Sequence, residues 1–161
     1  MIVVADTSPL NYLIQIGCDP LLPQLYGRIV APAGVIRELG HQDAPLAVSA
    51  WLKSIPDWIE IREAPLAADL GLLFLDLGER EAIQLAEEQK ADLLLIDERK
   101  GRQEAKRRGL RTTGTLGVLL TAGELQLIDA ESAYRRPLLD TTFRTSAALE
   151  SYFLRQIDRG R

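Results

Sequence analysis

The sequence predicts a three-layer α/β domain, in which helices cover both faces of a mostly parallel sheet. Short and nearly continuous apolar runs are typical of strands buried on both faces, and stretches of helical periodicity lie between them. Strands that alternate with helices favour a parallel sheet joined by right-handed crossovers. The composition, with 47% hydrophobic and 26% charged residues, excludes a disordered, collagen-like or disulfide-scaffold protein. At 161 residues the chain is about one domain long.

Five apolar runs are the expected strands. They are bounded by turn-forming or charged residues, and the last is the weakest: Ile2–Ala5, Arg28–Ala31, Trp58–Ile61, Leu93–Ile96 and Leu110–Thr113. The first helix is expected between the first two strands, with Ser8 as its N-cap and Pro9 at its first position. Later apolar stripes predict helices around 82–86, 118–125 and 149–157.

The strand signals stop after Ile128. Residues 129–161 read as two helices broken around 140–143. We therefore expect a domain over residues 1–128 and a helical extension over 129–161, packed on the domain or on a partner.

Charge and apolar content limit the class of protein. The net charge is −4, yet basic residues crowd one stretch in which Glu104 is the single acid: Arg99, Lys100, Arg102, Lys106, Arg107, Arg108 and Arg111. The longest uncharged stretches are shorter than the roughly 20 apolar residues that span a bilayer, and the first residues lack a signal peptide's basic region. The single cysteine, Cys18, is expected to be a small buried residue, and a cytoplasmic location is predicted.

Two acids follow strands directly. Asp6 comes after the first expected strand and Asp97, with Glu98, after the fourth. In an open parallel sheet, ligands bind outside the carboxyl ends of the strands. A turn or cap role is the simpler alternative for either acid alone, but both reach the edge where a site is expected.

Two further acids lie on helices near the apolar face. Glu79 shares the stripe of Ala82, Ile83 and Ala86, so it is expected to point inward, although an acid also suits a first helical turn. Glu81 is expected at the surface. Glu38 falls on the border of an apolar face, where a rim charge paired with Arg37 is the alternative.

Carboxylates that converge repel one another unless a cation neutralises them. Mg²⁺ or Mn²⁺ would do so with oxygen ligands. Zinc has no ligand set here, because His41 is the only histidine and Cys18 the only cysteine. We expect His41 to be exposed after a helix C-terminus.

The ordered motifs resemble the PIN-domain family, and most closely its short prokaryotic branch akin to the VapC toxins. The resemblance covers about residues 1–128 and rests on these motifs together: Asp6-Thr7-Ser8-Pro9-Leu10; Pro32-x-x-Val35-x-x-Glu38; Leu75-Asp-x-Gly78-Glu79-x-Glu81-Ala82-Ile83; Leu95-Ile-Asp97-Glu98-Arg99; and Thr113-Gly-Thr115. It implies a five-stranded parallel sheet and a Mg²⁺- or Mn²⁺-dependent ribonuclease.

The resemblance also implies roles for particular residues. Four acids would be catalytic and hold the metal, with three hydroxyls assisting: Asp6, Glu38, Glu79 and Asp97; Thr7, Ser8 and Thr115. Many toxin relatives carry a further acid three residues after the position of Asp97, where this chain has Lys100. Either Glu98 replaces that acid or the site holds one metal firmly, so the number of metals stays open.

The basic stretch after Asp97 fits a nucleic-acid substrate, because lysine and arginine neutralise phosphates without reading sequence. We expect four of its residues to bind RNA, with an ordinary solvated helix face as the alternative: Arg99, Lys100, Arg102 and Lys106. The resemblance further implies a toxin of a type II toxin–antitoxin pair, with a cognate antitoxin protein and a homodimer.

Other functions remain as alternatives. A housekeeping RNA-processing nuclease and a catalytically inactive PIN-like module that binds nucleic acid or regulates would both share these motifs. A haloacid-dehalogenase-type enzyme needs a second aspartate where this chain has Ser8, and a receiver domain needs a lysine where it has Thr113-Gly114-Thr115. A P-loop is absent from the sequence.

Overall fold

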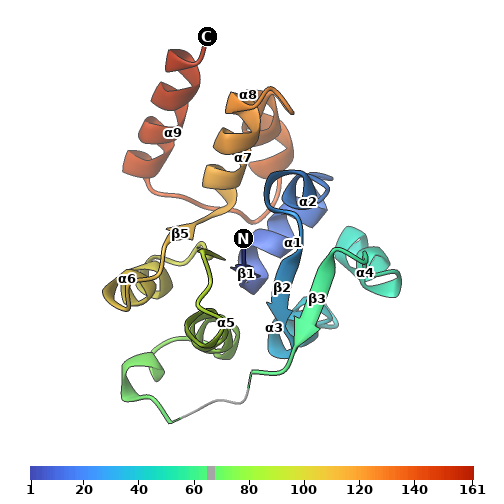
Figure 1. Ribbon diagram of the computed structural model, residues 1–161. Helices are drawn as coiled ribbons and strands as arrows, with labels where there is room; N and C mark the ends of the chain where they lie inside the picture. The colour runs from blue at the N-terminus through green and yellow to red at the C-terminus, as the bar shows by residue number, and fades with distance from the viewer. Residues whose placement is uncertain (65–67) are drawn as a thin grey trace.

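The computed structural model describes residues 1–64 and 68–161, and it is built around a five-stranded parallel sheet (Figure 1). The strands lie in the order β3-β2-β1-β4-β5. All their pairings are parallel, with Val3 opposite both Ile29 and Leu93. Their bounds agree with the five apolar runs to within a few residues: β1 (Val3–Ala5), β2 (Ile29–Pro32), β3 (Ile59–Arg62), β4 (Leu93–Leu95) and β5 (Thr112–Thr113).

Helices occupy the connections between the strands, as the alternating pattern predicts. From the N-terminus to β5 they are α1 (Thr7–Gln15), α2 (Leu21–Tyr26), α3 (Ala33–Leu39), α4 (Leu46–Lys53), the 3₁₀ turn η1 (Leu70–Leu72), α5 (Leu77–Glu88) and α6 (Arg99–Arg107). After β5 follow α7 (Thr115–Glu124), α8 (Ala130–Ala133), the π-helical turn η2 (Tyr134–Leu138) and α9 (Ala147–Arg159). No helix in residues 1–64 and 68–161 has the length and apolar character needed to cross a membrane.

The sheet separates two hydrophobic clusters, because successive strand residues face opposite sides. Val3 and Ala5 join the cluster that includes side chains from α1, α2, α4 and α7. Val4, between them, joins the cluster formed with α5 and α6. The molecule is therefore the three-layer α/β/α domain that the sequence predicts.

The start of α1 differs from the expectation. The helix begins at Thr7, and Asp6 rather than Ser8 holds the N-cap position in an extended conformation. Pro9 then lies at the third helical position, where its missing N–H removes only one of the donors that a first turn leaves unpaired. The prediction of Ser8 as the cap was wrong because β1 passes into the helix without an intervening loop.

The C-terminal segment contributes to the main core. Tyr134, Leu138, Phe143 and Phe153 belong to the same buried cluster as Leu10 of α1. The break between the two expected helical parts falls after Leu138 and before Ala147. The division into a domain over 1–128 and an extension over 129–161 stays a prediction.

Candidate acidic site at the carboxyl edge of the sheet

Asp6 lies where β1 ends and α1 begins, and its side chain is only 3% exposed. Its Oδ1 has no hydrogen-bond partner within the described part of the chain. Burial raises the pKa of Asp6 well above its usual value, and repulsion from Glu79, Asp76 and Glu38 raises it further, while the backbone N–H of Thr7 opposes the shift. A buried carboxylate with one unpaired oxygen is costly, so this position calls for a proton or a cation.

Glu38 lies on α3, the helix that follows β2, and its side chain reaches the same edge of the sheet. Its Oε2 accepts a hydrogen bond from Thr7 Oγ1 at 2.5 Å, and its Oε1 accepts one from the backbone N–H of Gly78 at 2.9 Å. Glu38 is exposed, and with Thr7 it lines a cavity of about 200 Å³ bordered by Asn11 and His41. Glu38 therefore ties α1, α3 and α5 together at the mouth of the site.

Glu79 is buried, at 5% exposure, as its place on the apolar stripe predicts. The N-cap residue Asp76 accepts a hydrogen bond from the Glu79 backbone N–H at 2.9 Å. Burial, followed by repulsion from Asp76 and more weakly from Glu98 and Glu38, raises the pKa of Glu79 to about 7. At neutral pH and with no cation bound, about half of the protein molecules therefore carry a protonated Glu79.

Asp97 is half-buried after β4 and is held by Thr115. Its Oδ1 accepts the backbone N–H of Thr115 and its Oδ2 accepts the Thr115 hydroxyl, each at 2.7 Å. Burial raises the pKa of Asp97, whereas both Thr115 hydrogen bonds and the charge of Arg102 lower it. A side chain at Gly114 would place its Cβ 2.5 Å from Asp97 Oδ1, so this carboxylate requires glycine there.

Of the remaining expected site residues, Thr7 and Thr115 are the hydroxyls that contact acids. Ser8 lies in the first turn of α1, and in the described structure no hydrogen bond joins it to the acids. Glu98 is exposed at the N-cap position of α6, and its charge raises the pKa of both Glu79 and Asp97.

The environments of two acids at or near the site were not foreseen. Asp76 repels Asp6 and Glu79, and the motif Asp76-Leu-Gly-Glu79 is a capping-box pattern that could have identified it. Glu81 was expected at the surface, but it is 5% exposed. It is buried because Gly34 of α3 leaves room for its carboxylate, a contact between distant parts of the chain that periodicity cannot reveal.

The donor chemistry of the site suits a hard divalent cation. Its side chains offer oxygen alone, and the unpartnered Asp6 Oδ1 is a buried acceptor for which the described structure has no donor. Across residues 1–64 and 68–161, however, no three acid, histidine or cysteine side chains are gathered closely enough to hold a metal ion. Hydrogen bonds hold Glu38 at Gly78 and Asp97 at Thr115.

Most of the basic stretch forms α6, which starts two residues after Asp97, while Arg108 and Arg111 follow the helix. Gly109, between these two arginines, has a positive φ of 80°. Arg99, Lys100 and Lys106 are exposed, and Arg102 is half-buried. Arg107 and Arg108 instead make ion pairs with acids of the chain, including Glu104 for both and Asp69 for Arg108. Part of the basic charge is therefore structural, and part faces solvent.

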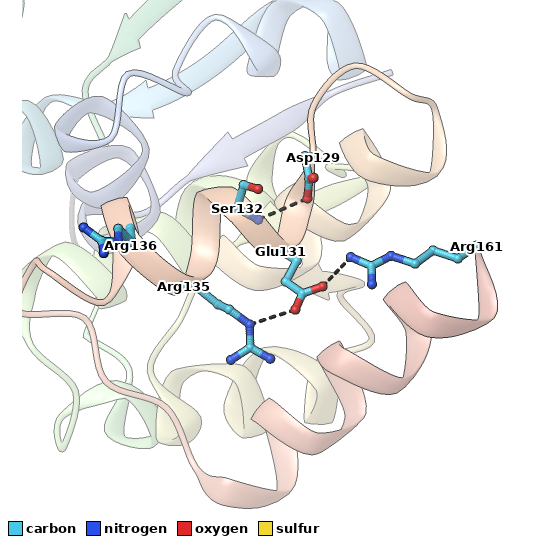
Figure 2. Close-up of a pocket in the computed structure, with 6 residues that line it drawn as sticks. All are labelled: Asp129, Glu131, Ser132, Arg135, Arg136 and Arg161. Carbon is cyan, nitrogen blue, oxygen red and sulfur yellow. Dashed lines mark hydrogen bonds and ion pairs between the residues drawn. The ribbon is translucent and has the colours of Figure 1, made fainter.

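A larger cavity of about 480 Å³ lies on the C-terminal segment and contains none of the expected site residues (Figure 2). In it, Glu131 pairs with both Arg135 and Arg161, and Asp129 caps α8 through the Ser132 N–H. Because three arginines face only two acids in this cavity, its lining carries no excess of negative charge that would attract a cation.

Known protein families provide an independent comparison. The family model DUF3368, described as "PIN domain", matches residues 2–159. No curated protein matches the chain. A match over nearly the whole chain, together with the five-stranded parallel sheet and the acids at its carboxyl edge, shows that the chain belongs to the PIN-domain family.

Proposed function

We propose that the protein is a Mg²⁺- or Mn²⁺-dependent endoribonuclease, and that it acts as the toxin of a type II toxin–antitoxin pair. PIN domains are generally nucleases that use divalent metals. The observation that supports this function most strongly is Asp6, a buried carboxylate whose Oδ1 lacks a partner within the described residues and whose neighbours are acids.

The acids have the chemistry that phosphodiester hydrolysis requires. Asp6, Glu79, Asp97 and Glu38 would hold the ion, which supplies an activated water and stabilises charge on the phosphoryl oxygens. Thr115 keeps Asp97 oriented through two hydrogen bonds, and Thr7 orients Glu38 through one. Glu79 exchanges a proton near neutral pH, because its pKa is about 7 in the absence of a cation.

The exposed cations of α6 support an RNA substrate. Arg99 and Lys100 lie two and three residues after Asp97, so phosphates bound to them are close to the acids. Lysine and arginine there would contribute affinity that falls with salt and carries no sequence information.

Cleavage of RNA by the purified protein tests the proposal. Total RNA would be incubated with Mn²⁺ or Mg²⁺, beside EDTA and the Asp97→Asn variant, whose amide can still bond to the Thr115 hydroxyl. We expect cleavage that needs metal and falls by more than about 100-fold in the variant. Equal cleavage by the variant would contradict the assignment of Asp97.

The toxin role requires a separate test. Expression of the protein should arrest growth, and coexpression of the product of an adjacent short gene should restore it. Size-exclusion chromatography with light scattering would test the proposed homodimer and its complex with that antitoxin. Growth that is unaffected by an active nuclease would favour a housekeeping RNA-processing enzyme.

Among the described residues, no three acid, histidine or cysteine side chains are gathered closely enough to hold a metal ion. This observation makes an inactive PIN-like module that binds nucleic acid the alternative function. Such a module would bind RNA equally well with and without the Asp97→Asn substitution and would show no cleavage in either form. An enzyme would keep its RNA binding in the variant and lose only cleavage.

A further inference from the structure

Two glycine–glutamate contacts join α3 to α5, which lie side by side (Figure 1). At the first, a Cβ on Gly78 of α5 would lie 2.6 Å from Glu38 Oε2. At the second, a Cβ on Gly34 of α3 would lie 1.6 Å from Glu81 Oε2. Each helix thus contributes one glycine and one glutamate, and no larger residue fits at either glycine without displacing a carboxylate.

The first contact places a residue of the candidate site. Glu38 accepts the Gly78 N–H at 2.9 Å, which belongs to the first turn of α5 and has no partner within its own helix. The next N–H, that of Glu79, is taken by Asp76. Glu38 therefore sits at a defined height on α5, directly beside the buried Glu79.

The second contact has no role in the function proposed above. Glu81 is 5% exposed, and its ion partner is Arg37, whose guanidinium lies 3.8 Å from Glu81 Oε1 and is 63% exposed on its side chain. Oε2 forms no hydrogen bond within the described residues. Burial raises the pKa of Glu81, and the charge of Arg37 and a backbone hydrogen bond from Gly34 oppose that shift only in part. The carboxylate is therefore held against the first turn of α3 at a cost in desolvation.

The spacing along α3 connects this contact to Glu38. Gly34 and Glu38 are four residues apart, so they lie one turn from each other on the same face of the helix. The Glu81 carboxylate packs against Gly34, and this contact fixes the rotation of α3 and its distance from α5. The position of Glu38 follows, because it is rigidly attached one turn further along.

We propose that Glu81 is a positioning residue, which by packing on Gly34 holds Glu38 at the Gly78 N–H and so keeps it in place for the metal. Only the final part of this inference, that Glu38 binds a metal, rests on the proposed function. The effect of Glu81 on the position of Glu38 does not require a bound metal, so it can be measured in the apo protein.

The test combines four variants with two readouts. The variants are Glu81→Ala, Glu81→Gln and Gly34→Ala, together with the double variant Gly34→Ala/Glu81→Ala. The first readout is hydrogen exchange of the Gly78 amide, measured by NMR in the apo protein against the amide of Leu85 in the middle of α5. The second is Mn²⁺ affinity, measured from the free-ion signal in electron paramagnetic resonance.

We expect Glu81→Ala to speed exchange at Gly78 while exchange at Leu85 stays unchanged, and to weaken Mn²⁺ binding by about tenfold. Glu81→Gln fills the same space, so it should stay within about twofold of the wild type on both readouts. Gly34→Ala displaces Glu81 and should reproduce the Glu81→Ala result or exceed it. The double variant, which removes the clash, should be no worse than Glu81→Ala.

Three outcomes would overturn the inference. Unchanged Gly78 exchange in Glu81→Ala would show that Glu81 does not hold Glu38. Faster exchange at both Gly78 and Leu85 would show a general structural role. Loss of Gly78 protection with unchanged Mn²⁺ affinity would remove the link to the metal. If the wild type itself bound no Mn²⁺, the proposed function would fail, and the exchange data would still decide the role of Glu81.

Discussion

At the scale of single residues, the candidate site is defined by acids whose burial disfavours the ionised carboxylate. Asp6, Glu79 and Asp97 all have raised pKa values, with burial as the largest cause in each. Burial disfavours the ionised form of such groups. A bound cation would instead favour the ionised form, so metal affinity and pH are expected to be coupled.

The pH dependence of stability tests this at Glu79. Its pKa is about 7 in the folded protein against 4.5 when unperturbed, so ionising it costs folding free energy as the pH rises between these values. Glu79→Gln should match the wild type near pH 4.5 and be more stable above pH 7, by at most about 3 kcal/mol. Urea unfolding at pH 5 and pH 8 measures the difference, and an equal effect at both values would contradict the raised pKa.

Mn²⁺ provides the matching control for that comparison. The ion should stabilise the wild type at pH 8 and have a smaller effect on Glu79→Gln, which lacks one negative charge at the site. Equal stabilisation of both proteins would place the ion elsewhere.

A second residue-scale prediction concerns Thr115, which is fully buried and donates to Asp97 through its hydroxyl. Thr115→Val keeps the shape and the backbone hydrogen bond but leaves Asp97 Oδ2 without its donor. We expect a loss of roughly 1.5–3 kcal/mol in the free energy of unfolding near pH 7, measured in urea. Thr115→Ser, which keeps the hydroxyl, is the control and should lose less than Thr115→Val.

At the scale of elements, α5 and α6 bring the acids and the exposed cations to one edge. The N-terminus of α5 presents Gly78 to Glu38 and Glu79 to Asp76, so two carboxylates complete its first turn. The N-terminus of α6 follows Asp97 directly and carries Glu98 and Arg99. The site is therefore assembled from helix ends, which the strands β1 and β4 hold at a fixed spacing.

The exposed face of α6 gives a prediction for RNA binding. Replacing Arg99, Lys100 and Lys106 together by Gln should weaken RNA binding and reduce its salt dependence by about two units of log K per log salt. Filter binding between low and moderate salt would measure both. The control, with Gln at the exposed Arg28, Lys53 and Arg155, removes the same charge outside α6 and should leave the salt dependence nearly unchanged.

At the scale of the whole molecule, the C-terminal segment shares the core of the sheet. Phe153 of α9 is 1% exposed, and its ring centroid lies 5.1 Å from that of Tyr134. Both belong to the cluster that also buries Leu10 behind the sheet. The segment is thus expected to unfold together with the rest of the protein.

Phe153→Ala tests that expectation. It should destabilise the protein by roughly 3–5 kcal/mol and shift a single unfolding transition, because the cavity opens in a shared core. Tyr152→Ala, at a side chain that is 51% exposed, should change stability by no more than about 0.5 kcal/mol. Two separate transitions, with only the first shifted, would indicate that residues 129–161 form an independent unit.

The sequence by itself determined the sheet, the strand positions and the direction in which Glu79 points. These features depend on local hydrophobic periodicity, which is set by the two faces of the sheet and by the buried stripe of α5. The sequence also predicted that Asp6 and Asp97 lie at the same edge, because parallel strands end at one edge of a sheet. Asp76 could have been added from its capping-box spacing.

Only the tertiary structure decided that Glu81 is buried, that Glu38 bonds to Gly78, and that Arg107 and Arg108 are occupied by ion pairs. Each depends on a partner from another element, 40 residues away for Glu38 and Gly78. The physical reason is that burial of a charged side chain depends on the space and the donors that a neighbouring element offers. Periodicity along one helix records which face is apolar, and it contains no information about a glycine on the helix opposite.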